Sequence, residues 1–197
     1  MRYIQLVLFC LLYCSLGSAN EQPALKCDLL IQNGRVVDGS GNPWFYADIA
    51  IKDGRITAIG KLLPHVSTYT IEAKGLVIAP GFIDIHSHSD TNILRDGLAQ
   101  SKIRQGVTTE ILGEGGSAAP STGARTPRSL SINGQIRRWS TFTEYFDLID
   151  QQTISVNIAS YVGLSTVWEC VMGNSFARPN ESQFIQMEEL IKTAMQQ

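Results

Sequence analysis

The sequence predicts an α/β protein in which a small N-terminal β-sandwich unit is followed by the first part of a (β/α)8 TIM barrel. Three observations indicate this. Short strands with tight turns fill residues 28–79. After Pro80, strands alternate with helices, which favours a parallel sheet with crossover connections. An eight-fold barrel takes about 250 residues, and the 197-residue chain has fewer than half as many after Pro80. We therefore expect an incomplete barrel of about three βα units.

The first nineteen residues are predicted to be a secretory signal peptide. Arg2 is followed by an apolar run and then by the small residues Gly17, Ser18 and Ala19, which is the pattern of a cleavable export signal. The run is too short for a comfortable membrane span, which needs about 20 apolar residues. We expect cleavage after Ala19, export to the periplasm or outside the cell, and no membrane partner afterwards.

Residues 20–79 are predicted to form a small antiparallel β domain. Asn33-Gly34 lies between two apolar runs and predicts a two-residue hairpin, as does Asp53-Gly54. The two apolar runs on either side of Lys74-Gly75 are expected to pair with each other. His65 is expected to lie in a solvated loop of this domain.

Residues 80–197 are predicted to hold the barrel portion. The expected strands are 82–86, 107–112 and 154–162. The expected helices are 96–105, 141–151, 165–172 and 181–197. The second helix begins with a Thr-x-x-Glu capping box at Thr141 and Glu144. The stretch 117–140 is expected to be a long polar loop.

Two histidines at the end of the first barrel strand are the main functional signal. His86 and His88 are two of only three histidines, and they follow a Pro-Gly turn and an apolar run. On a strand, residues two apart share a face, with Cα atoms about 6.6–7 Å apart. A His-x-His pair alone is weak evidence, because histidines at a strand end can also bind nothing. In this context it predicts a divalent metal site, with zinc expected and manganese or iron also compatible.

Longer stretches carry a family resemblance. Ala79–His88, Ser101–Gly115 and Asn157–Gly163 with Val171-Met172-Gly173 resemble the amidohydrolase superfamily, and within it the N-acyl-D-amino-acid deacylases (D-aminoacylases). The resemblance covers nearly all of the chain after residue 19. It implies a metal-dependent hydrolase that converts a small-molecule N-acyl-D-amino acid to a carboxylate and a D-amino acid, with the histidine pair in its metal centre.

The resemblance also indicates further site residues. In relatives, a cysteine near the end of the second barrel strand ligates metal, but the matching stretch here, Gly113–Gly116, has none. Glu114 is therefore a candidate metal ligand, the alternative being a loop acid that does not touch the ion. Asp90 is a candidate for contacting the substrate or the metal ligands. The general acid/base aspartate of the family is expected beyond residue 197, so we expect a fragment that is inactive alone and binds metal weakly.

Composition excludes some partners and leaves two alternatives. The net charge is −2 with no basic stripe, so no nucleic-acid partner is expected. Cys27 and Cys170 are far apart in sequence, and no disulfide between them is expected. The alternatives are a cyclic amidase of the dihydroorotase or hydantoinase type and a secreted remnant without catalytic activity.

Overall fold

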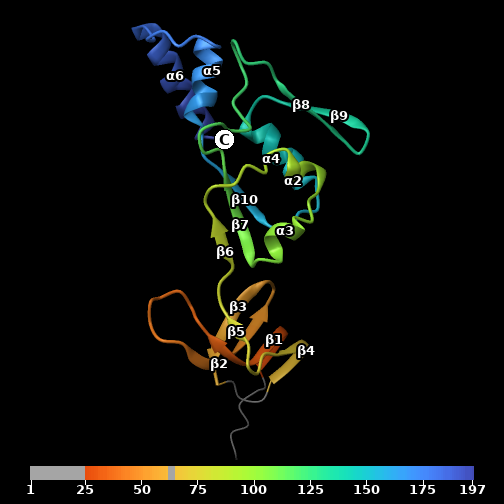
Figure 1. Cartoon of the computed structure of the whole chain (residues 1–197). Coiled ribbons are helices and arrows are strands. Elements are labelled where there is room, and N and C mark those ends of the chain that lie inside the picture. Colours follow the sequence, from red (N-terminus) through yellow and green to blue (C-terminus); the bar gives the residue numbers. More distant parts are fainter. Residues whose placement is uncertain (1–24, 62–64) are drawn as a thin grey trace, which may run out of the picture. The chain divides into compact units, whose positions relative to one another are not determined.

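The structure is a computed structural model that describes residues 25–61 and 65–197 (Figure 1). The predicted signal peptide lies outside the described residues. The chain divides into two compact units, Met1–Pro80 and Gly81–Gln197, and each is taken by itself below. In the part of the chain that the structure describes, no helix has the length and apolar character needed to cross a membrane.

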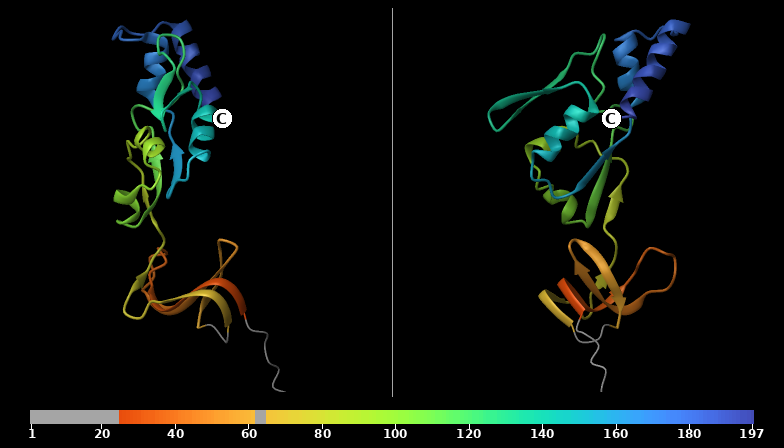
Figure 2. Two further views of the ribbon diagram at one scale, coloured as in Figure 1. Left: turned by 90° about the vertical axis from the view of Figure 1, so that its right-hand side faces the viewer. Right: turned by 180° about the vertical axis from the view of Figure 1, so that it is seen from behind.

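The first unit is a mixed sheet of five strands. They are β1 (Leu25–Val36), β2 (Phe45–Lys52), β3 (Arg55–Gly60), β4 (His65–Glu72) and β5 (Val77–Ile78). The order is β3-β2-β1-β4, and β5 also pairs with β1. This sheet is drawn in red to yellow in Figure 2. β1 is antiparallel to β2 but parallel to β4 and β5. A wholly antiparallel unit was therefore the wrong prediction, as was pairing across Lys74-Gly75, because both flanking runs pair with β1. A sandwich needs a second sheet, which residues 25–61 and 65–80 do not contain, so it stays a prediction.

The Asn33-Gly34 pair lies inside β1 and not in a hairpin turn. Asn33 has a φ of +60°, its amide donates to Asp48 Oδ1 at 2.8 Å, and its side-chain amide donates to Glu72. The pairing of β1 with β2 shifts register there, which defines a β-bulge. A Cβ atom at position 34 would lie 2.0 Å from Ile78 Cδ1, so a larger residue there would force the Ile78 side chain to move. Long-range contacts therefore keep the strand continuous where local sequence predicts a turn.

Two other predictions for this unit have clear outcomes. Asp53 and Gly54 form the turn between the antiparallel strands β2 and β3, with φ of +50° and +70°, so the second hairpin is confirmed. His65 is the first residue of β4, so its placement in a loop was wrong. It pairs with Leu25 of β1, and such a distant partner leaves no signal near residue 65.

The second unit is built on three parallel strands. β6 (Phe82–Asp84), β7 (Val107–Leu112) and β10 (Asn157–Ser160) form a sheet of order β10-β7-β6. Between β6 and β7 lie α2 (Asn92–Arg95) and α3 (Gln100–Ile103). α4 (Phe142–Asp150) precedes β10, and α5 (Leu164–Met172) and α6 (Glu181–Ala194) follow it. Neighbouring parallel strands joined through helices are the expected α/β arrangement, while closure into a barrel stays a prediction.

Some elements of this unit differ from the sequence prediction. Within the expected helix 96–105 only α3 is helical, and it begins after Ala99, whose φ of +44° is not helical. The other short helix, α2, ends at Arg95, before the expected helix starts. The expected loop 117–140 contains a hairpin, β8 (Arg128–Ile132) and β9 (Gln135–Trp139), whose turn at Asn133-Gly134 has positive φ at both residues. The predicted capping box of α4 at Thr141 and Glu144 is confirmed. Cys27 and Cys170 are buried free thiols in different units.

The main core of the second unit brings together strand and helix residues. Leu112 of β7 and Tyr145 of α4 are fully buried, and Trp139 of β9 is 1% exposed. The apolar residues around β6 are different, because Phe82, Ile83 and Ile85 are each more than 60% exposed. An apolar strand of a parallel sheet is usually buried on both faces, but β6 is an edge strand, and among the described residues only β7 pairs with it.

Candidate metal centre

His86 and His88 lie just beyond the end of β6 at Asp84, so strand alternation does not place them as predicted. The structure nevertheless brings the two imidazoles together. Their Nε2 atoms are 3.1 Å apart, and the rings meet edge to face with centroids 5.0 Å apart. Two nitrogens bound at about 2.0–2.1 Å to one tetrahedral zinc would lie about 3.3–3.4 Å apart. The pair therefore has nearly the spacing of two ligands of one ion.

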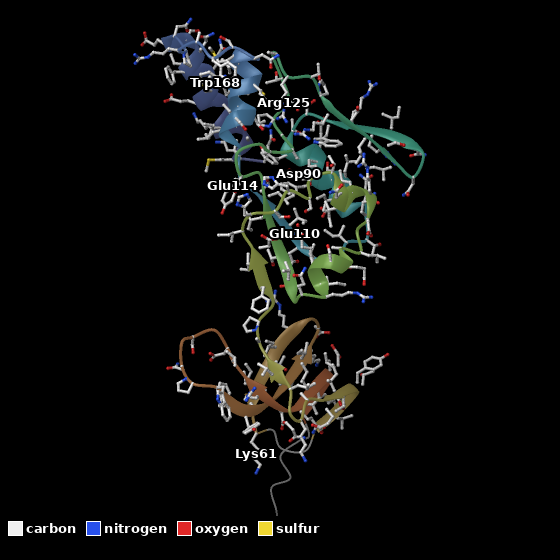
Figure 3. The ribbon with its side chains drawn as sticks, in the orientation of Figure 1. Lys61, Asp90, Glu110, Glu114, Arg125 and Trp168 are labelled. Carbon is white, nitrogen blue, oxygen red and sulfur yellow. The ribbon has the colours of Figure 1, made fainter. Side chains whose placement is uncertain are left out.

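Glu114 approaches His86 from the other side of the ring. Its Oε2 lies 2.6 Å from His86 Nδ1, with both side chains more than half exposed. Figure 3 labels Glu114, which follows Gly113 immediately after β7. Gly113 has a φ of +84°, and a Cβ atom there would lie 2.4 Å from the Tyr161 carbonyl oxygen, so this turn needs glycine. The three predicted ligands are thus neighbours, but Glu114 contacts the ring nitrogen that faces away from His88.

The described residues offer a pair of donors and not a full cage. Among residues 25–61 and 65–197, no group of three or more histidine, cysteine, aspartate or glutamate side chains is arranged to hold a metal ion. Two histidine nitrogens supply half of the four ligands that zinc usually takes.

Asp90 is held at the edge of the core by α4. Its backbone carbonyl accepts a hydrogen bond from the Tyr145 hydroxyl at 2.9 Å, and burial raises the pKa of that hydroxyl. The Asp90 Oδ1 atom is buried and has no hydrogen-bond partner among the residues that the structure describes. Asp90 is labelled in Figure 3.

Glu110 is a buried acid that the sequence analysis missed. It lies on β7 opposite Asp84 of β6 and is 1% exposed. Its Oε2 accepts hydrogen bonds from the hydroxyls of Ser87 and Ser89, the residues on either side of His88. The ammonium of Lys102, on α3, lies 3.8 Å from the same oxygen. The available sequence signal was a lone acid inside the predicted strand 107–112.

Lys102 lies between Glu110 and Asp84 and forms ion pairs with both. Its Nζ donates to Asp84 Oδ2 at 2.6 Å, and this bond is the main reason that the pKa of Asp84 is lowered and that of Lys102 raised. Both groups are therefore charged at neutral pH. A cavity of about 430 Å³ borders the cluster and is lined by Ser87, His88, Ser89, Lys102 and Glu110 among others.

Comparison with known proteins shows which enzymes the chain is similar to. No model of a known protein family matches it. The D-aminoacylase of Alcaligenes xylosoxydans xylosoxydans is 37% identical over 183 residues, which are 91% of this chain and 37% of that protein. The N-acyl-D-aspartate deacylase of the same organism is 31% identical over 183 residues, 91% of this chain and 36% of the relative.

A solved structure gives the same result. The N-acyl-D-glutamate deacylase from Bordetella bronchiseptica, complexed with zinc and a phosphonate inhibitor that mimics the tetrahedral intermediate, has a TM-score of 0.76 and 32% identity. The match covers 87% of this chain and 36% of that one. Over about 90% of its length the chain is thus homologous to enzymes of the amidohydrolase class. More narrowly, these homologues are N-acyl-D-amino-acid deacylases, which confirms the resemblance seen in the sequence. It spans little more than a third of the length of the curated relatives described above.

Proposed function

We propose that this chain is the part of an N-acyl-D-amino-acid deacylase that supplies the first two metal ligands. The observation that carries the proposal is the 3.1 Å approach of the Nε2 atoms of His86 and His88. Support comes from the family of the chain and from the zinc in the related Bordetella enzyme. The reaction of the complete protein would be hydrolysis of a linear amide to a carboxylate and a D-amino acid.

Each residue of the site has a distinct proposed role. His86 and His88 would hold the metal through Nε2. Glu114 accepts the Nδ1–H of His86, which leaves the Nε2 lone pair free and fixes the plane of the ring. This orienting role fits the 2.6 Å contact better than the direct ligation expected from sequence. A bound divalent metal would acidify a water molecule and polarise the amide carbonyl.

The remaining ligands and the proton-transferring carboxylate are proposed to lie outside residues 1–197. Two facts support this: the described residues supply only a pair of donors, and the chain covers 37% of the related D-aminoacylase. A fragment of this kind binds zinc weakly and has no deacylase activity. Hydrolysis of N-acyl-D-amino acids, or of cyclic amides, by the purified 197-residue chain would refute this part of the proposal.

Zinc titration of the purified chain tests the metal site. We expect His86→Ala and His88→Ala each to weaken zinc binding at least about tenfold, since each removes one of two ligands. His65→Ala is the matched control, because His65 is the third histidine and lies in the other unit. Equal zinc affinity in all three variants would overturn the proposed site.

Glu114→Gln separates the two roles of Glu114. Glutamine keeps an oxygen that can accept the His86 Nδ1–H, so an orienting residue tolerates the change with less than about a threefold loss of zinc affinity. If Glu114 were a ligand, the loss would equal that of His88→Ala.

We also propose that the protein is exported through residues 1–19. The basic start, the apolar run and the small residues ending at Ala19 support this. Mass spectrometry of the protein recovered from the producing cells tests it. A mature N-terminus at Asn20 is expected, and an intact Met1 in the cytoplasmic fraction would contradict it.

A further inference from the structure

We propose that Glu110 is a positioning residue that holds the histidine segment in metal-binding geometry. The inference rests on the proposed metal site. Ser87 and Ser89 lie on either side of His88, and both hydroxyls donate to one oxygen, Oε2, of Glu110. The two hydroxyl oxygens are 3.2 Å apart. The Glu110 carboxylate therefore binds the residues on both sides of His88, a proposed metal ligand.

Glu110 and Ser87 are both buried and attached to β7. Glu110 is on β7, the middle strand of the three-stranded sheet, and is 1% exposed. Ser87 is 3% exposed, and its backbone amide donates to the Ile111 carbonyl of β7 at 3.2 Å. Ser87 is thus fixed to β7 by its main chain and by its side chain, although it lies beyond the end of β6. Metal ligands must be placed to within a few tenths of an ångström, and this double attachment supplies that placement for His88.

Lys102 makes the buried carboxylate possible. Its Nζ lies 3.8 Å from Glu110 Oε2 and donates to the Ser87 hydroxyl at 3.3 Å. Glu110 Oε1 is buried without a hydrogen-bond partner in the described part of the chain. An apolar side chain would serve stability at least as well, because well-packed apolar residues commonly replace buried ion pairs without loss. Leu112, on the same face of β7, is fully buried in that way. The presence of an acid at position 110 is therefore explained by its hydrogen bonds to Ser87 and Ser89 and not by packing.

Glu110→Leu tests the role, because leucine can fill the site but cannot accept a hydrogen bond. We expect an unfolding midpoint equal to or above that of the wild type, together with zinc binding weakened about 10–100-fold. The metal-free chain gives an independent readout. The His86 and His88 rings, with centroids 5.0 Å apart, should show a ring-to-ring nuclear Overhauser effect that Glu110→Leu abolishes. Glu188→Gln, at an exposed acid on α6, should change neither measurement.

The double variant Ser87→Ala/Ser89→Ala removes the donors and leaves the acid. It should lose the same ring contact, and adding Glu110→Leu to it should cause little further loss, since the two changes break the same bonds. A ring contact that survives both sets of changes would overturn the positioning role. It would do so even if Glu110→Leu failed to fold, because the serine variant is read separately. A wild-type chain with the ring contact but no zinc binding would instead refute the proposed metal site.

Discussion

Replacing Trp139 by phenylalanine tests how the second unit holds its core. The indole is 1% exposed, and its Nε1–H donates at 3.0 Å to the carbonyl of Ala118, which is fully buried. Phenylalanine leaves that carbonyl unpaired, at a cost of about 1–3 kcal/mol. The smaller ring leaves a cavity that costs about 1 kcal/mol more. We therefore expect Trp139→Phe to lower the free energy of unfolding by about 2–4 kcal/mol.

Trp168→Phe is the matched control. Its Nε1–H donates to the Ser175 carbonyl at 2.9 Å, but this bond is exposed, so water can replace the lost donor and the cost should stay below about 1 kcal/mol. Urea unfolding followed by circular dichroism measures both variants. If the two substitutions lowered the unfolding free energy equally, burial of the Trp139 bond would not be the source of its stability, and the reasoning would be refuted.

Three further predictions concern stability and pH. Tyr145→Phe removes the partly buried hydrogen bond to the Asp90 carbonyl and should lower the free energy of unfolding in urea by about 1–2 kcal/mol; no change would show that the bond contributes nothing. Gly163→Ala would put a Cβ atom 2.6–2.8 Å from three backbone atoms of residues 115–117, whereas the nearest atom for Gly116→Ala is at 3.4 Å. Gly163→Ala should lower the free energy of unfolding by about 1–3 kcal/mol more than Gly116→Ala in the same assay. Equal losses would contradict the close packing around Gly163. The lowered pKa of Asp84, due to its bond with Lys102, predicts stability that is lost as pH falls below the ordinary value of 3.8. The raised pKa values of Lys102 and Tyr145 predict loss as pH rises above 10.5 and 10.0. Thermal unfolding across the pH range checks both signs, and greater stability at either extreme would contradict them.

Local signals were read correctly where local contacts decide the structure. The capping box of α4 is closed by residues three apart, and the Asp53-Gly54 turn joins strands that pair with each other. The Asn-Gly signal gave mixed results. Asn133-Gly134 is a hairpin that the prediction passed over as loop, and Asn33-Gly34 is a bulge that it took for a hairpin. The two Asn-Gly pairs differ because β1, which contains Asn33, pairs with β2, β4 and β5. These strands are distant in sequence, so the residues around position 33 do not predict the pairing.

The histidine pair could be found from sequence because its two members are neighbours in the chain. The Glu114 contact with His86 could only be suggested, since the family resemblance pointed to the turn after β7 but not to the ring nitrogen that the acid contacts. Glu110 was not found, because its partners Ser87 and Ser89 are more than twenty residues away. Only the register between β6 and β7 brings them together.

The edge position of β6 has a consequence for the behaviour of this chain in solution. An exposed apolar strand edge is a template on which strands of other molecules can add, which leads to precipitation. Within the run 82–85, Asp84 is the single charged residue, and charges in such runs act as gatekeepers against this association. The carboxylate that pairs with Lys102 therefore also helps to keep separate molecules from joining edge to edge.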